Sequence, residues 1–390
     1  MEIKVYDKNL EPVGTADEMN SVIWQPSYWA PAAPDDFSIL APITENNKKL
    51  FVKGNILILH GEEPEYTDES GKKWKRAAQI RYRRIAKDEK GVENIEVQGS
   101  FLKRWLSNRI IIKEGTITGT NQKIITELVK ENCTDTAGNK RAFKQFVILP
   151  QEELGGSTVE YAREYGMSLA DAVYERALVG KLGYDILVND KEKLYGFWLY
   201  KGRDLSAGNT AGNDPCIFSR DSDNVNEQEY EESDENEKNV AYVIGAADDD
   251  AVQPKTTAVK GDEAEGIDRR ELFVEATDIA RKEKDAGGEE TPIPLARYEQ
   301  LMKQKGEGTL EEHRETMSFS STINASQNLQ YKTDFVIGDI VTSKETKWGI
   351  TIDARITKIK QTFQGGKKSL DVTFGDSMPT LAEQIKKAGK

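Results

Sequence analysis

Alternation of hydrophobic and polar residues dominates the first 115 positions. The stretches MEIKVYD, LFVKGNILILHG, AQIRYRRIAK and ENIEVQGSFL each carry apolar residues at every second position or in short runs. A period of two places such residues on one face of a β-strand. Glycine and polar turns separate the stretches, and DEKGV between the last two suits a hairpin loop. Residues 1–115 are therefore predicted to form a first β-barrel domain.

The apolar period becomes helical after Gly115. The stretch TNQKIITELVKENC places its aliphatic residues on one helical face. Ser168, with Asp171 three residues later, predicts the start of a second helix. The strand-like stretches AFKQFVILP and LYGFWLYKG accompany these helices. Residues 116–203 are predicted to form an inserted α+β domain.

Strand patterns return in CIFSRD, KNVAYVIGAA and RRELFVEAT. Residues 204–290 are predicted to be strands with acidic loops that complete the barrels. Within them, DDDAVQPKTTAVKGDEAEG at 248–266 has the composition of a surface loop. The helix LARYEQLMKQKG is expected to end at Gly306, and Thr309 to cap the next helix.

A last hairpin is expected in YKTDFVIGDIVTSKETKWGITIDARITKIKQTF, residues 331–363. In its second strand the apolar phase slips by one residue between Ile356 and Ile359. Such a slip predicts a β-bulge. Residues 291–378 are predicted to form a second β-barrel domain with preceding helices, and residues 379–390 a C-terminal helix.

Charge is concentrated in one segment. The 390-residue chain has a formal net charge of −13, and residues 221–265 hold fifteen Asp or Glu against three Lys or Arg. That segment alone accounts for −12 of the charge. An uneven distribution can create a local field, whereas a solvated outer loop would have the same composition.

The opposite extreme is KKWKRAAQIRYRRIAK, residues 72–87, with eight basic residues and no acidic one. Basic residues that alternate with aromatics can bind nucleic acid. A strand hairpin with a charged outer face, or a contact between subunits, explains the same pattern, and the acidic segment of the same chain would repel DNA. The hairpin or subunit contact is the favoured interpretation.

Catalytic and metal-binding patterns are sparse. The chain has two histidines and two cysteines, and Cys133 and Cys216 are predicted to be free, buried thiols. RDSDNVNEQEYEE lacks the glycine of a calcium loop, and GGKKS lacks the first glycine of a P-loop. No cofactor is expected. The sequence has no apolar run long enough to span a membrane and no signal-peptide pattern at its start.

Several stretches, taken in order, resemble a known family. TDFVIGDIVT, GITIDARITKIKQTF, SLDVTFG and PTLAEQI resemble the last barrel of phage tail-hub proteins. Upstream, YGFWLYKGRDLS, CIFSRDSDNVNEQEYEESDENEKNVAYVIG and GIDRRELFVEA are similar to the ReqiPepy-type siphovirus minor tail proteins, as is GSFLKRWLSNRIIIKEGTITGTNQKIITELVKENC. The resemblance spans about residues 1–378.

The resemblance implies a mainly β protein of the α+β class, with two similar hub-type β-barrels and a smaller inserted α+β domain. It implies a structural and non-enzymatic role in the virion, as a homotrimeric hub ring at the distal end of the tail. Three chains with two barrels each would form a pseudo-sixfold ring around a channel. The implied neighbours are a distal tail protein or tail tube ring, the tape measure protein, and tail-tip or receptor-binding proteins. DNA would pass through without specific binding.

In such a ring the acidic segment could face the channel, where negative charge would repel the DNA backbone. The candidate lumen-facing residues are Asp221, Asp223, Glu227, Glu229, Glu231 and Glu232. Two other functions stay open. A cell-wall hydrolase needs only two suitably placed carboxylates. A carbohydrate- or receptor-binding module could stack sugars on Trp24, Tyr28 and Trp29, although packing of a loop explains these aromatics equally well.

Overall fold

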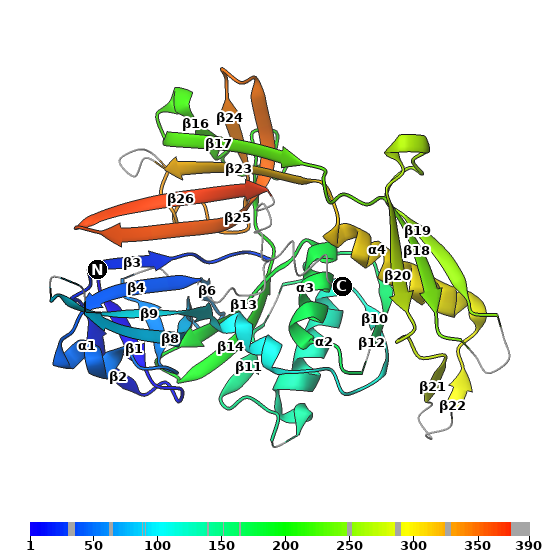
Figure 1. Cartoon of the computed structure of the whole chain (residues 1–390), viewed down its shortest axis with the longest axis horizontal. Helices are drawn as coiled ribbons and strands as arrows, with labels where there is room; N and C mark the ends of the chain where they lie inside the picture. The colour runs from blue at the N-terminus through cyan, green and yellow to red at the C-terminus, as the bar shows by residue number, and fades with distance from the viewer. Residues whose placement is uncertain are drawn as a thin grey trace.

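The structure is a computed structural model. It describes residues 1–29, 36–61, 65–87, 89, 91–138, 140–150, 152–163, 165–247, 252–284, 290–323 and 329–375. Figure 1 shows a stack of strands at one end, a mixed α+β region in the middle and a separate strand–helix module at the other end. The chain is mainly β, as the sequence predicts.

The first group of strands comes from the N-terminal residues. These elements are β1 (Ile3–Tyr6), β2 (Pro12–Ala16), β3 (Ser21–Trp24), β4 (Phe37–Pro42), α1 (Glu45–Leu50), β5 (Ile56–Leu59), β8 (Ala78–Lys87) and β9 (Glu93–Phe101). They hydrogen-bond in the order β3-β4-β9-β8-β5-β1-β2. Alternate residues of β4 are fully buried, as a period of two requires. Strands β3, β4, β9, β8 and β5 are called the first unit below.

The second group comes largely from the C-terminal residues. Its elements are β15 (Asp204–Leu205), β16 (Ile217–Ser219), η3 (Arg220–Ser222), β17 (Val225–Ser233), β23 (Thr316–Ile323), β24 (Ile340–Glu345), β25 (Ile350–Gln364) and β26 (Lys367–Gly375). Strands β17, β23, β26, β25 and β24 hydrogen-bond in that order and are called the second unit. Strands β15 and β16 pair with β24 in parallel.

The two units repeat one design. Each unit has five antiparallel strands side by side. When the strands are numbered by their order along the chain, their order across the sheet is first, second, fifth, fourth, third in both units. The fourth strand of each carries a bulge, between Ile80 and Tyr82 in β8 and between Ile356 and Lys358 in β25. The predicted bulge in the last hairpin is therefore confirmed. A difference lies at the next strand, since β1 pairs with β5 antiparallel whereas β16 pairs with β24 in parallel.

Strand β25 joins the units into one sheet. Its first part pairs with β24, and residues Gln361–Gln364 pair with Ser21–Trp24 of β3. Each unit retains its own buried apolar cluster, one around Phe37 and one around Phe374. No sheet in the described residues closes on itself, so closed barrels are not confirmed.

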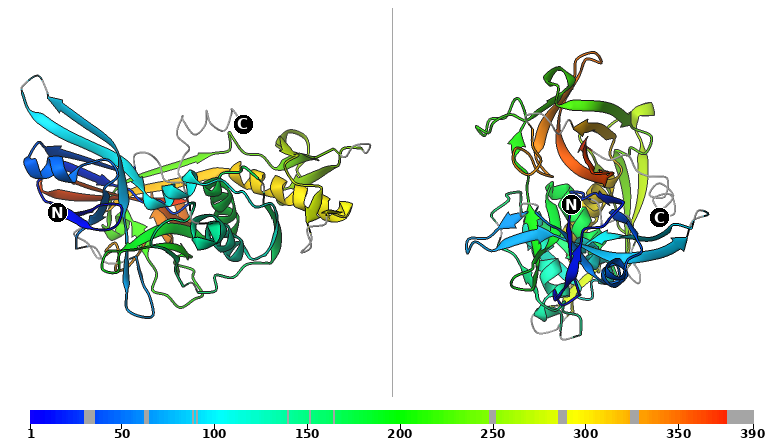
Figure 2. Two further views of the ribbon diagram at one scale, coloured as in Figure 1. Left: turned by 90° about the horizontal axis from the view of Figure 1, so that it is seen from below. Right: turned by 90° about the vertical axis from the view of Figure 1, so that its left-hand side faces the viewer.

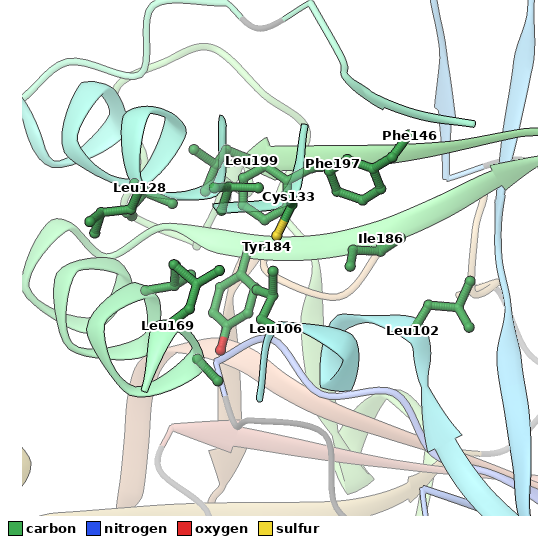
Figure 3. Packing of buried hydrophobic residues seen from close by; sticks show 14 of the residues in the cluster. Leu102, Leu106, Leu128, Cys133, Phe146, Leu169, Tyr184, Ile186, Phe197 and Leu199 are labelled. Atoms are coloured by element: carbon green, nitrogen blue, oxygen red, sulfur yellow. The ribbon is translucent and has the colours of Figure 1, made fainter. Parts of the chain in front are cut away.

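The central α+β region follows the first unit. It contains η1 (Leu102–Asn108), β10 (Gly115–Gly119), α2 (Asn121–Cys133), η2 (Asp135–Ala137), β11 (Phe146–Ile148), β12 (Val159–Arg163), α3 (Leu169–Gly180), β13 (Gly183–Asn189) and β14 (Leu194–Tyr200), and β6 (Tyr66–Thr67) and β7 (Lys73–Arg76) join its sheet. Both predicted helices are present, and the Ser168 hydroxyl accepts from the backbone N–H of Asp171. Figure 3 shows their apolar faces packed against β13 and β14 around the thiol of Cys133.

The outlying module is inserted between β17 and β23. It consists of β18 (Val240–Gly245), β19 (Lys255–Val259), η4 (Gly266–Asp268), β20 (Glu271–Ala276), β21 (Lys282–Lys284), β22 (Glu290–Pro292) and α4 (Leu295–Glu312). The loop predicted over 248–266 thus contains β19, whose β-branched residues pair with β18. Residues 248–251 lie outside the described residues.

The helix α4 corrects two predictions. It does not end at Gly306, and Thr309 does not cap a new helix, because its hydroxyl bonds the Lys305 carbonyl inside α4. Gly306 lies against the sheet, where an added Cβ would come within 2.7 Å of Val243 Cγ2. Glycine here permits close packing of helix on sheet instead of ending the helix.

A buried ionic cluster ties the regions together. Arg76 of β7 donates to Asp185 of β13 at 2.7 Å and lies 3.0 Å from Glu65, which also pairs with Lys332 from the connection between β23 and β24. Burial alone would raise the pKa of the Glu65 carboxyl, but the charges of Arg76 and Lys332 outweigh it and hold that pKa below its usual value. The cluster thus joins the central sheet to the chain segment that precedes β24.

The predicted domain boundaries remain a prediction. Hydrogen bonds cross them, because β3 pairs with β25 and β7 pairs with β13. The C-terminal helix predicted over 379–390 lies outside the described residues.

Candidate assembly surface

The feature that stands out is a continuous band of strands, called the band below. It has the order β17-β23-β26-β25-β3-β4-β9-β8, and every neighbouring pair is antiparallel. Figure 1 shows these strands stacked side by side from top to bottom. One face of the band is apolar and covers the cores of both units. The residues of the other face are mostly partly or fully exposed, and this face is called the open face below.

The open face is polar across both units. Pairing registers place on it Glu227, Glu229 and Glu231 of β17, Ser318, Ser320 and Thr322 of β23, Asp371 and Thr373 of β26, Lys358, Lys360 and Thr362 of β25, Ser21 and Ile23 of β3, Ser38 and Leu40 of β4, Glu96 and Gln98 of β9, and Tyr82 and Arg84 of β8. Hydroxyl groups fill its middle. The Thr322 hydroxyl donates to Asp371 at 2.7 Å, and Lys360 lies 3.8 Å from the same carboxylate.

One end of the band is an acidic edge. Among the described residues, β17 pairs with β23 alone, so its other backbone edge is free. Glu227, Glu229 and Glu231 are exposed and point to the open face. Glu232 is exposed on the opposite face, where the Tyr230 hydroxyl donates to it at 2.7 Å.

The other predicted acidic residues do not join this group. Asp221 lies in η3, where it accepts a hydrogen bond from the Thr346 hydroxyl, and Asp223 follows it with a left-handed backbone, φ 53°. The structure therefore brings together three of the six candidates on one face and separates Glu232, Asp221 and Asp223 from them. The alternation of glutamate at 227, 229 and 231 was the sequence signal for this shared face.

The opposite end of the band is a basic edge. After Ile80, β8 leaves β5, and from Arg81 to Lys87 its backbone pairs only with β9 in the described part of the chain. This stretch carries Arg81, Arg83, Arg84 and Lys87, and Figure 2 shows the β8–β9 hairpin extending past its neighbours. Ile85 is 53% exposed although its strand face is apolar. The favoured interpretation of residues 72–87 as a charged hairpin agrees with this geometry for residues 81–87 only, because Lys73–Arg76 form β7 in another sheet, where Trp74 and Arg76 are buried.

Two other candidate features are structural. Trp24 and Tyr28 are 2% and 0% exposed, which leaves their rings no surface for a sugar, and Arg314 lies over the ring of Trp29. Cys133 and Cys216 are free and buried, as predicted, and burial raises both pKa values to about 12. Within the described residues there is no cluster of three or more metal-ligating side chains. No described helix is both long enough and apolar enough to cross a membrane.

The comparison with protein families is decisive for identity. The sequence profile described as Siphovirus ReqiPepy6 Gp37-like protein matches residues 2–376. The chain belongs to this family. The match confirms the resemblance to siphovirus ReqiPepy-type tail proteins. No curated protein matches the sequence of this Gp37-like chain.

Solved structures share the fold of this Gp37-like protein. A tail protein from Neisseria meningitidis MC58 has a TM-score of 0.54 at 13% identity, over 96% of each chain. The prophage MuSo2 43 kDa tail protein from Shewanella oneidensis has the same TM-score and identity, over 96% of this chain and 98% of its own. Prophage tail protein gp18 from Listeria monocytogenes has a TM-score of 0.50 at 10% identity, over the whole of both chains. Such low identities show a shared fold alone.

Proposed function

We propose that this Gp37-like chain is a structural subunit of a phage tail hub. Copies pair edge to edge through the band and form a closed, homotrimeric ring around a channel at the distal end of the tail. The protein works in the virion as scaffold and docking platform, without catalysis or cofactor.

The observation that carries the proposal is the pair of free edges, acidic on β17 and basic on β8. Free edges are templates for pairing with another chain, and opposite charges select one edge for the other. The band holds an even number of antiparallel strands, so β8 and β17 run in opposite directions. Copies related by rotation about a ring axis would therefore continue the antiparallel pattern, and a head-to-tail contact of this kind closes into a ring.

Three copies are inferred from the family resemblance. Each copy contributes two units of one design, so three copies would present six similar units to a sixfold tail tube. The proposed neighbours are a distal tail protein or tube ring, the tape measure protein, and tail-tip or receptor-binding proteins.

The purified full-length chain should therefore form a trimer with a central hole. Light scattering measures the mass and negative-stain images show the shape. A chain that stays monomeric at high concentration and in the presence of tail-tube protein would contradict the ring. Clearing of cell walls by that monomer would favour the hydrolase, and binding to host sugars would favour the receptor-binding module.

We further propose that the open face of the band lines the channel, with Glu227, Glu229 and Glu231 repelling the DNA backbone. Changing these three residues to glutamine, alone or with Asp221, Asp223 and Glu232, is expected to slow DNA release from assembled particles several-fold, because a neutral wall lets phosphates interact with the lysines of the same face. The measurement is release kinetics after a trigger. The matched control changes only Asp221 and Asp223, which do not share that face. Equal kinetics in all particles would contradict a channel-lining role.

A further inference from the structure

The junction between the two units of one chain shows how one band edge accepts another. Gln361–Gln364 of β25 pair with Ser21–Trp24 of β3, and the same register continues to the bridge between Lys358 and Ser27. Between them, the Ile359 N–H donates to the Pro26 carbonyl at 3.1 Å. The last half of β25 is thus held by the first strand of the neighbouring unit.

Pairing registers relate the two units residue by residue. Tyr82 and Lys358 are each the first residue after the bulge, and they oppose Gln98 and Thr373. In the first unit, Gln98 opposes Ser38 and Ser38 opposes Ile23. In the second unit, Thr373 opposes Ser320 and Ser320 opposes Glu229. Strand β8 therefore corresponds to β25, and β17 corresponds to β3.

Side chains support this correspondence independently of the backbone. Ala78 matches Ala354, and both pair with the third strand of their unit. Trp24 packs on Phe37 with ring centroids 5.9 Å apart, and at the matching positions Tyr230 packs on Phe319 at 6.0 Å. The same design therefore extends to the aromatic pair beside each first strand.

We propose that β8 of one copy pairs with β17 of the next in the register of the β25–β3 junction. Transferring that register places Ile85 opposite Tyr230, Arg84 opposite Glu231, and Arg83 opposite Glu232 of the next copy. The inference rests on the proposed ring and adds to it the residues and the alignment of the contact.

The transferred register gives side chains of β8 a partner from β17 of the next copy. Ile85 lies on the apolar face of β8, and Tyr230 of the next copy covers it there, as Trp24 covers Gln361 within the chain. Arg83, whose Nη2 donates to the Lys48 carbonyl at 3.3 Å, is placed beside the carboxylate of Glu232 of the next copy. Arg84, whose side chain is 61% exposed beside Glu96, gains Glu231 on the open face. A slip by one residue would place Ile85 against a glutamate and reverse the faces.

The register can be tested with one pair of cysteines in the full-length chain. Ala86 and Glu229 match Thr362 and Ile23, which oppose each other in the junction. Ile359 and Pro26 are a hydrogen-bonded pair there, so by alternation Thr362 and Ile23 are a non-hydrogen-bonded pair. Ala86 and Glu229 of the next copy form the same kind of pair, in which Cα atoms are about 4.5 Å apart and a disulfide fits. On a denaturing gel, the variant A86C/E229C should change under mild oxidant from a monomer band to a covalent trimer band, and reductant should reverse the change. The native thiols are buried and should not compete.

The matched control is K87C/E229C, which is shifted by one residue so that the two thiols point to opposite faces. It should assemble equally well and remain uncrosslinked. Each variant is also measured without oxidant by light scattering. If rings form but crosslink only in K87C/E229C, or in neither variant, the proposed register is wrong and the proposed ring stands. Failure of the unmodified chain to form rings with tail-tube protein would overturn the proposed function instead.

Discussion

Reversing two charges on β8, with Arg83→Glu and Arg84→Glu, is expected to abolish ring assembly. In the proposed register these side chains oppose Glu232 and Glu231 of the next copy, so the change places like charges opposite each other at every junction. Like-charge contacts across an interface cost several kcal/mol. A loss of about 2 to 4 kcal/mol per junction corresponds to about 30- to 1000-fold weaker pairing. Analytical ultracentrifugation across a concentration series measures the loss.

The rescue makes this experiment specific. Adding Glu231→Arg and Glu232→Arg to the same chain restores opposite charges at each junction, and the ring should return. Arg84→Glu alone is the milder control, because that side chain is largely exposed and its ion pair within the copy is the exposed one with Glu96. Far-ultraviolet circular dichroism of all variants should match the original chain. If the fourfold variant folds but stays monomeric, the charge pairing is wrong.

Removal of the guanidinium by Arg76→Met should strongly destabilise the folded chain. The Arg76 side chain is 3% exposed and holds the carboxylates of Asp185 and Glu65, which are 1% and 7% exposed. Breaking a buried ion pair by deleting one partner costs about 3–5 kcal/mol, because the remaining charge stays buried without compensation. Urea unfolding of the monomeric chain should show this loss as a lower midpoint.

The pH dependence of the Arg76→Met effect follows from Glu65. Its pKa is depressed in the folded protein, so its contribution to stability is present above the ordinary carboxyl range and is lost as pH falls through the folded value. The stability difference between Arg76→Met and the original chain should therefore narrow in acid. Lys49→Met, which removes an exposed cation, is the control and should leave the free energy of unfolding within about 0.5 kcal/mol of the original. Equal loss in both variants would contradict the assigned role of the cluster.

Local patterns predicted local structure well in this protein. Helix α2 and the Ser168 cap of α3 follow from apolar period and capping chemistry, and the bulge of β25 follows from the slip in its apolar phase. The prediction that a helix ends at Gly306 is wrong. Glycine is common at helix ends and also where a helix packs closely on a sheet, and here the close approach of Val243 shows the second role. Local sequence does not contain that information.

The sequence did not predict which strands pair with each other. A period of two identifies a strand and its buried face but does not identify the strand beside it. The pairing of β3 with β25 joins residues from opposite ends of the chain, and the free edges of β8 and β17 follow only from the whole order of strands. The acidic and basic segments were visible as charge. The sequence did not show that these two segments lie at the two ends of one band.

The long separation between β3 and β25 has a consequence for synthesis. Residues Gln361–Gln364 leave the ribosome about 340 residues after Trp24. At about 5–20 residues per second, the β3 edge of a nascent chain stays open for about 20 to 70 seconds. Strand β3 corresponds to β17, so its open edge offers the same backbone pairing that we propose for β8 of a finished copy. It lacks the charge, because Ser21 and Ile23 stand where β17 carries Glu227 and Glu229. In the proposed ring, the glutamates would therefore also select finished subunits over unfinished chains on the same polysome as partners for β8.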